Sequence, residues 1–411
     1  MKKNMLIAQS GGPSSAINAS ITGAIVRGMA STKIGRVLGA VNGMQGFLDR
    51  KIIDISAQIK TSEDIRLLYH TPAHALGSSR YKIKAGDTDT YKKIVEILKE
   101  YEVGYFFYNG GNDSMDTVNK LAEYLKETGE DIVALGIPKT IDNDLELTDH
   151  TPGFGSAARY VGTSIAEVYL DTRVYPVPAC TIVEVMGRNA GWLTAATALA
   201  RDTGVPAPHL IYLPESDFDK DAFVRDVKAL MEKEDHVVVA ASEGLRTKDG
   251  EYLGDTGAEL DMFGHKTFGG VATVLESLVK QNVDLPKLKT RAIQLSTLQR
   301  AAAHCASLTD LEEGYHCGYR AVEAAVNDLS GVMITIKRVS NSPYIVRYDV
   351  GDLSEIANKE KKVPQEWITK NGTDVSEEMM DYLRPLITGE TSGMSEKGLP
   401  RYFFFDLERL V

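Results

Sequence analysis

The sequence predicts an α/β fold in which mostly parallel sheets are flanked by helices. Six apolar runs of strand length are nearly continuous rather than alternating, which is typical of strands buried on both faces. Segments with helical periodicity lie between these runs, as expected when crossover helices join parallel strands. The predicted strands are residues 4–9, 103–109, 131–137, 180–186, 209–213 and 237–242. The predicted helices are residues 15–29, 91–101, 114–126, 155–170, 190–200, 220–232 and 310–329.

The chain is long enough to form two lobes. At 411 residues it exceeds the length at which one hydrophobic core usually divides, so we expect two Rossmann-like lobes with an active site in the cleft between them. The first lobe is predicted over residues 1–150, joined by part of the C-terminal region, and the second over 151–330. Residues 331–411 mix short apolar pieces with charges, which indicates an extension that packs on the lobes.

Composition and charge exclude several classes of protein. The net charge of −11 opposes nucleic-acid binding, and no apolar run is long enough to cross a membrane. The apolar stretch at residues 5–8 is too short for a signal peptide, so we expect a cytoplasmic location. Cys180, Cys305 and Cys317 are odd in number and widely spaced, which predicts buried free thiols rather than disulfides or a metal site.

Polar, glycine-rich turns follow the predicted strands, where parallel sheets bind ligands. Residues 10–15 (SGGPSS) can hold a phosphate on free backbone amides, or they can merely connect a strand to a helix. In residues 110–114 (GGNDS), Asp113 and Ser114 can cap the following helix. Alternatively, Asp113 lies beside bound phosphate, and this arrangement needs a bridging cation such as Mg²⁺.

The turn at residues 138–144 (PKTIDND) is the most informative of these segments. It places a lysine, a hydroxyl and several Asx residues directly after a buried strand, more than a structural turn requires. Phosphoryl transfer to an alcohol needs a carboxylate that accepts the hydroxyl proton and a cation that neutralises the transferring group. Asp142 can meet the first need and Lys139 the second.

Arginines recur near the ends of later predicted strands. Arg188 lies in residues 186–191, Glu243 lies in an SEG turn, and Arg291 and Arg300 bracket the apolar piece AIQLSTLQ. The guanidinium fork matches phosphate oxygens, so these arginines are candidates for clamping a sugar phosphate. Taken alone, Arg188 is also compatible with an ordinary surface position, although the functional interpretation is favoured.

Together these motifs resemble the phosphofructokinase family. The early GG turn, GGNDS, PKTIDND, EVMGR, SEG and the late arginine pair occur in the family's order over residues 1–333. The tail from DLSEIANKEKKVP onward resembles the longer, pyrophosphate-dependent members. The resemblance implies a glycolytic enzyme that transfers a phosphoryl group from pyrophosphate to the 1-hydroxyl of fructose 6-phosphate. The reaction would be Mg²⁺-dependent and reversible.

The resemblance also implies roles for individual residues. Asp142 would be the general base, with Thr140 and Asp144 beside it, and Arg188 would stabilise the transferring phosphoryl group. The first lobe would hold the donor, with Gly11, Gly12, Arg80 and Gly111 as donor-binding residues. The second lobe would bind the sugar phosphate. The substrate-binding residues would be Thr140, Ile141, Asp142, Met186, Gly187, Arg188, Glu243, Arg291, Thr297 and Arg300.

Two positions indicate the donor. ATP-using members have glycine where Asp113 and Lys139 stand, whereas pyrophosphate users have aspartate and lysine. The Asp113 side chain would occupy the space of a nucleotide α-phosphate and repel it, and Lys139 suits the small, highly charged pyrophosphate.

The chain departs from the family pattern at other positions. Asn112 replaces a metal-associated aspartate, which leaves the Mg²⁺ ligands open among Asn112, Asp113 and Asp144, or through water. Thr297 replaces a histidine or tyrosine of the sugar-phosphate site, and Ala179 replaces an arginine that reaches a neighbouring subunit.

The resemblance implies a homodimer or homotetramer. Two other functions remain open for the same fold: an ATP-dependent 6-phosphofructokinase and a non-catalytic sugar-phosphate sensor.

Overall fold

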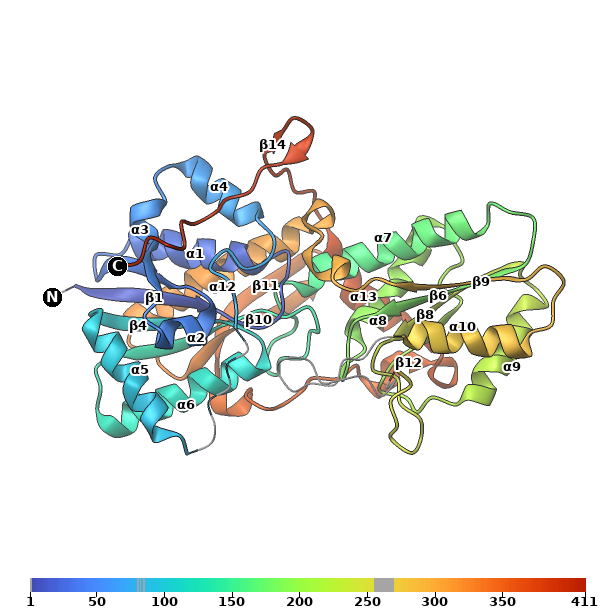
Figure 1. Ribbon diagram of the computed structural model, residues 1–411, viewed down its shortest axis with the longest axis horizontal. Coiled ribbons are helices and arrows are strands. Elements are labelled where there is room, and N and C mark those ends of the chain that lie inside the picture. Colours follow the sequence, from blue (N-terminus) through green and yellow to red (C-terminus); the bar gives the residue numbers. More distant parts are fainter. Residues whose placement is uncertain (1, 80, 82, 84–85, 255–269) are drawn as a thin grey trace. The chain divides into compact units, whose positions relative to one another are not determined.

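The computed structural model describes residues 2–79, 81, 83, 86–254 and 270–411, and the chain forms two compact units (Figure 1). Unit 1 comprises Met1–Ser156, Arg300–Glu360 and Thr388–Val411. Unit 2 comprises Ala157–Gln299 and Lys361–Ile387. Within the described residues, no helix combines the length and the apolar character that crossing a bilayer requires.

Unit 1 is built on a seven-stranded sheet whose five central strands are parallel. The outer strands β3 and β11 pair antiparallel with their neighbours. In spatial order the strands are β11 (Tyr344–Asp352), β10 (Val332–Asn341), β5 (Val133–Pro138), β4 (Val103–Gly110), β1 (Lys3–Gln9), β2 (Ile34–Ala40) and β3 (Ile52–Asp54).

Helices cover both faces of this sheet because its central strands are apolar on both sides. In β1, Leu6 and Ala8 belong to one core cluster, and Met5 and Ile7 belong to the cluster on the opposite face. The first cluster includes side chains of α2 (Gly43–Leu48), α5 (Thr88–Glu100) and α6 (Asn112–Thr128). The second includes side chains of α1 (Ile17–Met29), α3 (Ile55–Gln58), α4 (Ser62–His70) and α12 (Leu308–Val326).

Helices α1 and α12 pack closely in unit 1 (Figure 1). A Cβ on Gly23 would lie 1.9 Å from the Tyr315 carbonyl oxygen, and one on Gly318 would lie 1.8 Å from that of Ser20. The two glycines therefore allow the helix backbones to touch. Short elements complete the unit: α11 (Leu298–Ala301), which ends here, η2 (Ala303–Cys305), η3 (Leu353–Glu355), β14 (Ser395–Glu396) and β15 (Leu399–Pro400).

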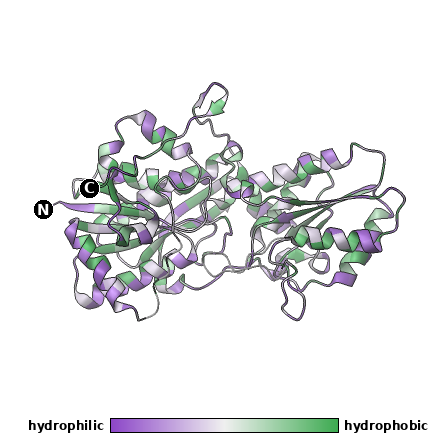
Figure 2. Cartoon of the chain, in the orientation of Figure 1, coloured by the Kyte–Doolittle hydropathy of each residue, from purple (hydrophilic) through white to green (hydrophobic). Residues whose placement is uncertain are grey.

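Unit 2 contains a four-stranded parallel sheet. Its order is β7 (Leu210–Tyr212), β8 (His236–Ser242), β6 (Ala179–Val185) and β9 (Lys289–Gln294). Side chains of α9 (Lys220–Met231) and α10 (Val271–Asn282) share one core cluster with β6, β7 and β8. Strands β6, β7 and β8 are mostly hydrophobic, whereas the helices α9 and α10 carry both hydrophobic and hydrophilic residues (Figure 2). The unit also contains α7 (Phe154–Thr172), most of which belongs here, α8 (Trp192–Ala195) and η1 (Ala196–Thr203).

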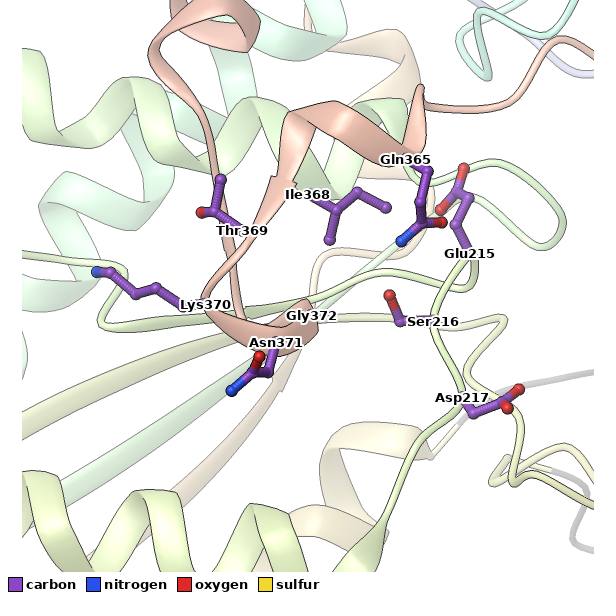
Figure 3. A pocket seen from close by; sticks show the side chains of 9 residues that line it. All are labelled: Glu215, Ser216, Asp217, Gln365, Ile368, Thr369, Lys370, Asn371 and Gly372. Atoms are coloured by element: carbon purple, nitrogen blue, oxygen red, sulfur yellow. The ribbon is translucent and has the colours of Figure 1, made fainter.

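The segment Lys361–Ile387 is an integral part of unit 2. The Trp192 indole nitrogen donates to the Lys361 carbonyl at 2.9 Å, and the Trp192 ring lies 5.3 Å from that of Tyr382. A pocket of about 540 Å³ lies where residues 215–217 meet residues 365–372, and none of its lining residues is a predicted site residue (Figure 3). The elements of the segment are η4 (Gln365–Trp367), β12 (Ile368–Thr369), η5 (Lys370–Gly372), β13 (Asp374–Val375), α13 (Glu377–Leu383) and η6 (Arg384–Ile387).

The predicted fold class is confirmed, but the chain divides differently from the predicted lobes. Residues 300–330 lie in unit 1 rather than in a second lobe over 151–330, because α12 packs on α1. Residues 331–411 do not form one extension, since 331–360 and 388–411 lie in unit 1 and 361–387 in unit 2. The predicted helix over 190–200 is a short α-helix followed by a 3-10 helix.

Candidate active site

Three predicted turns lie side by side in unit 1 because β1, β4 and β5 are neighbours in the sheet. The turn at 10–15 follows β1, the turn at 110–114 follows β4, and the turn at 138–144 follows β5. The Lys139 amide donates to the Gly110 carbonyl at 3.0 Å, and the Ser10 amide donates to that of Asn109 at 2.9 Å. The carboxyl edge of the sheet therefore brings together the donor-binding and catalytic segments predicted for the first lobe.

Lys139 connects two of these turns. Its side chain is only 3% exposed, and its ammonium group donates to the Gly12 carbonyl at 2.7 Å. Gly11 has a φ of +80°, and a Cβ there would lie 3.1 Å from the Lys139 Nζ. A glycine at position 11 thus permits both the left-handed backbone and the close approach of the lysine.

Arg300 joins Lys139 as a second cation beside the glycine turn, and His74 lies close to both as a neutral side chain. A Cβ on Gly12 would lie 3.5 Å from the Arg300 Nη1. Burial and the positive charges of Lys139 and Arg300 lower the pKa of His74 to about 3, so its imidazole is neutral at physiological pH. The sequence interpretation missed His74 because a lone histidine before LGSSR carries no motif. Arg300, predicted for the sugar phosphate, lies against Gly12, one of the proposed donor-binding glycines.

The turn that carries Asp142 is held by hydrogen bonds on both sides. The Asp142 amide donates to the Thr140 Oγ1 at 3.1 Å, and the Thr140 amide donates to the Pro152 carbonyl at 3.2 Å. The Thr151 hydroxyl donates to the Thr140 carbonyl at 2.8 Å. Asn143 adopts a left-handed φ of +56°, and its Oδ1 accepts from the Thr151 amide at 3.1 Å. These contacts leave Asp142 partly exposed while Ile141 packs inward.

Asn112, one of the three predicted metal ligands, has its side chain hydrogen-bonded to the backbone. The Asn112 Oδ1 accepts from the Asn358 amide at 2.9 Å, and the Asn112 Nδ2 donates to the Lys359 carbonyl, so both amide atoms bind the backbone of residues 358–359. Asp113 lies exposed in the first turn of α6, and the N-cap residue is Gly111, which has no side chain to cap the helix. The described residues contain no group of three His, Cys, Asp or Glu side chains that could hold a metal. Mg²⁺ prefers one or two carboxylates together with phosphate oxygens, and Asp113 and Asp144 are carboxylates of this kind.

Most predicted residues of the second lobe meet at one edge of the unit 2 sheet. Met186, Gly187 and Arg188 follow β6, and Glu243 follows the neighbouring β8. The Gly187 amide donates to the Glu243 Oε1 at 3.4 Å. A Cβ on Gly244 would lie 1.9 Å from the Arg188 carbonyl oxygen, so a glycine after Glu243 allows the two turns to touch.

Thr297 lies in the exposed turn after β9, and buried Gln299 ties this turn to Met186. The Gln299 Oε1 accepts from the Met186 amide at 3.0 Å, while its Nε2 donates to the Ser296 carbonyl at 2.9 Å. Gln299 was not predicted from the sequence, since nothing in a lone glutamine beside Arg300 indicates this contact.

Arg291 is not brought to this edge of the sheet. It pairs with Thr181 near the amino-terminal ends of β9 and β6, and its guanidinium forms an exposed ion pair with Asp171. Arg80, predicted to bind the donor, lies outside the described residues.

Comparisons with known proteins identify the family of this chain. A family model described as "Phosphofructokinase" matches residues 4–336. The pyrophosphate–fructose 6-phosphate 1-phosphotransferase of Halomonas elongata is 40% identical over 409 residues, covering 97% of this chain and 95% of that protein. The enzyme of the same name from Xanthomonas campestris pv. campestris is 41% identical over 404 residues, with the same coverage. The crystal structure of a pyrophosphate-dependent phosphofructokinase from Nitrosospira multiformis superposes with a TM-score of 0.86 at 38% identity and covers 97% of this chain and 95% of its own. The chain therefore belongs to the phosphofructokinase family.

Proposed function

We propose that the protein transfers a phosphoryl group from pyrophosphate to the 1-hydroxyl of fructose 6-phosphate, giving fructose 1,6-bisphosphate and phosphate. One observation carries this proposal: buried Lys139 bridges to the Gly12 turn, and Asp142 lies three residues further along the same segment. A cation and a proton acceptor therefore lie on one short turn beside a glycine-rich anion site. The names of the similar proteins agree with this donor and acceptor.

The reaction follows from the roles of these groups. Asp142 accepts the proton of the 1-hydroxyl. At the same time the hydroxyl oxygen forms a bond to the transferred phosphorus, and the bridging P–O bond of pyrophosphate breaks. Lys139 and Arg300 neutralise charge that develops on the leaving phosphate, and Arg188 does the same for the transferring group. Bound Mg²⁺, held by Asp113 and Asp144, would screen the donor's phosphate oxygens. The reaction breaks one P–O bond, in pyrophosphate, and forms another, to the sugar oxygen. Because the two bonds are similar, transfer should run in both directions.

Each unit has a separate task in this proposal. Unit 1 binds pyrophosphate on the turns after β1, β4 and β5. Unit 2 binds the sugar phosphate with Arg188, Glu243 and the backbone of Met186 and Gly187. Arg291 lies at the other end of β9 and is exposed, which makes it the weakest of the predicted substrate contacts. A homo-oligomeric assembly in the cytoplasm belongs to the same proposal.

A donor assay tests the proposal. Purified protein is supplied with fructose 6-phosphate, Mg²⁺ and either pyrophosphate or ATP, and both products are identified in the forward and reverse directions. We expect turnover with pyrophosphate, none after chelation of Mg²⁺, and little with ATP because Asp113 repels the nucleotide's α-phosphate. Turnover with ATP alone would indicate the ATP-dependent enzyme. The absence of bisphosphate with every donor would favour a sugar-phosphate sensor.

Substitution of Gly11 tests the donor turn separately. Gly11→Ala places a methyl group beside the Lys139 Nζ and strains a left-handed residue, so the free energy of unfolding should fall by about 1–2 kcal/mol. The KM for pyrophosphate should rise about 10-fold as the lysine is displaced. Gly129→Ala is the matched control, because Gly129 has a φ of +69° and a Cβ added there would meet nothing within 4 Å. In the control, the free energy of unfolding, measured with denaturant, should fall by a similar amount while the KM for pyrophosphate stays unchanged. Equal KM values in both variants would contradict the proposal that the Gly11 turn binds pyrophosphate.

A further inference from the structure

A buried ionic cluster lies next to the catalytic turn in unit 1 and contains none of the proposed reacting groups. His150, only 1% exposed, lies between two carboxylates. Its Nδ1 is 2.8 Å from the Asp149 Oδ2, and its Nε2 is 2.6 Å from the Glu313 Oε2 on α12. Ionised carboxylates only accept hydrogen bonds, so both ring nitrogens must carry a proton and the imidazole is cationic.

Two further side chains complete the cluster. The Tyr344 hydroxyl donates to the Glu313 Oε1 at 2.6 Å. The Arg338 Nε donates to the Asp149 Oδ2 at 3.0 Å. The cluster thus balances two carboxylates against an imidazolium and a guanidinium. Such a buried arrangement fixes a geometry more effectively than it adds stability, because every member depends on its partners.

The segment that His150 anchors is the one that holds the catalytic turn. Thr151 follows His150 directly and donates to the Thr140 carbonyl and, through its amide, to the Asn143 Oδ1. Pro152 accepts from the Thr140 amide. One helical turn before Glu313, the Asp310 Oδ1 accepts from the Gly153 amide at 2.8 Å. Carboxylates of α12 therefore fix both ends of the strip of residues 150–153 on which the Asp142 turn rests.

We propose that His150, clamped between Asp149 and Glu313, is a positioning residue that holds the Asp142 turn in its reactive conformation. The inference rests on the function proposed above for Asp142. His150 itself contacts no proposed substrate group and acts through Thr151 and Pro152. Here the clamp means the hydrogen bonds from His150 to Asp149 and Glu313. Its loss should let residues 140–143 shift, and a small misplacement of a catalytic group is enough to slow the chemical step.

The clamp should weaken at alkaline pH. Burial by itself would lower the pKa of His150, but the charges of Glu313 and Asp149 outweigh it and raise this pKa to about 9. This folded-state pKa exceeds the unfolded value of about 6.5, so the cluster's stabilisation is complete below pH 6.5 and is lost as the pH rises through 9. The titratable and charged groups that face the cluster from the packed elements are Asp149, Asp310, Glu313, Cys317, Arg338, Tyr344 and Tyr348. Burial raises the pKa of Asp310 to about 6, so it does not titrate near pH 9.

Kinetics of His150→Gln test the inference on the full-length enzyme. We expect kcat to fall about 10- to 100-fold, with both KM values changed much less, because binding groups remain in place. The kcat of the wild type should fall as the pH rises above 9, and this fall should be absent from the pH profile of the variant. His209→Gln is the matched control: it removes a mostly buried histidine of unit 2, whose Nδ1 accepts from the Val238 amide at 3.0 Å. A comparable loss of thermal stability with unchanged kcat is expected for this control.

Hydrogen exchange gives a readout that does not depend on the donor or the acceptor. The Thr140 amide should exchange at least about 10-fold faster in His150→Gln than in the wild type, and no faster in His209→Gln. If the wild type fails to use pyrophosphate, the proposed function is wrong but the exchange result still decides the inference. Tyr344→Phe removes only one hydroxyl from the cluster and serves if His150→Gln does not fold. Wild-type kcat and wild-type Thr140 exchange in a folded variant of either kind would overturn the inference.

Discussion

Asp142→Asn is expected to lower kcat by about 1,000-fold or more while both KM values stay within about threefold of the wild type. The asparagine keeps the size of the side chain and the hydrogen bond from the residue 142 amide to the Thr140 Oγ1, since that bond uses the backbone. It removes the only function that the proposal gives to the side chain, which is to accept the proton of the sugar hydroxyl. Steady-state kinetics in both directions measure the effect.

The control for Asp142→Asn should carry the same chemical change at a neutral position. Asp131 is an exposed aspartate of unit 1 whose side chain forms a surface ion pair with Lys3. Pairs of this kind contribute at most about 1 kcal/mol, so Asp131→Asn should leave kcat unchanged. If Asp142→Asn keeps a tenth of the wild-type kcat, another group accepts the proton and the proposed mechanism is incorrect.

The strands that the sequence predicts are those buried on both faces. Six apolar runs became β1, β4, β5, β6, β7 and β8, each within a few residues of its predicted bounds. The missed strands are mostly at or near sheet edges, where one face meets solvent and charged residues interrupt the apolar run. In β11 exposed and partly buried positions alternate over most of the strand, and the first half of β9 contains the basic residues Lys289 and Arg291. Such segments contain too little continuous hydrophobic pattern to distinguish strand from loop.

The site turns were predictable because each follows a strand at the carboxyl edge of a parallel sheet. The contacts that refine them were not, since they join residues far apart in the sequence. Asn112 binds the backbone at position 358, which is 246 residues away, and nothing in the GGNDS segment indicates this partner. The placement of Arg291 depends on where β9 begins, and a difference of a few residues moves a side chain from one end of a strand to the other.

The lobe boundary illustrates the same limit. A chain that crosses between units at several points cannot be divided by reading composition along the sequence. Residues 300–326 join unit 1 because Gly23 and Gly318 let α12 and α1 pack backbone to backbone. The same packing places Glu313 of α12 beside His150, so the cluster that holds the catalytic turn also depends on a helix that lies far away in the sequence.

Lys139→Met is expected to lower kcat/KM for pyrophosphate by about 100-fold or more. Methionine preserves most of the buried stem but removes the ammonium group that bonds the Gly12 carbonyl. Two effects then combine: the glycine turn loses a contact that fixes its position, and the leaving phosphate loses a cation in a site shielded from water. The second effect dominates if Lys139 acts in catalysis, because a charge in a poorly solvated site interacts strongly with the developing phosphate charge.

A second variant, Lys33→Met, separates the two effects of Lys139→Met. The Lys33 ammonium group also donates to a backbone carbonyl, that of Val326 in unit 1, but Lys33 follows the C-terminal end of α1, whereas the turn at residues 10–15 precedes this helix. Lys33→Met therefore measures the cost of losing a lysine–carbonyl bond alone, and it should leave kcat/KM unchanged. If the charge of Lys139 matters chiefly to the transition state, kcat for pyrophosphate should fall more than KM rises. A Lys139→Met variant with wild-type kcat and a raised KM would instead show that the lysine only shapes the donor turn.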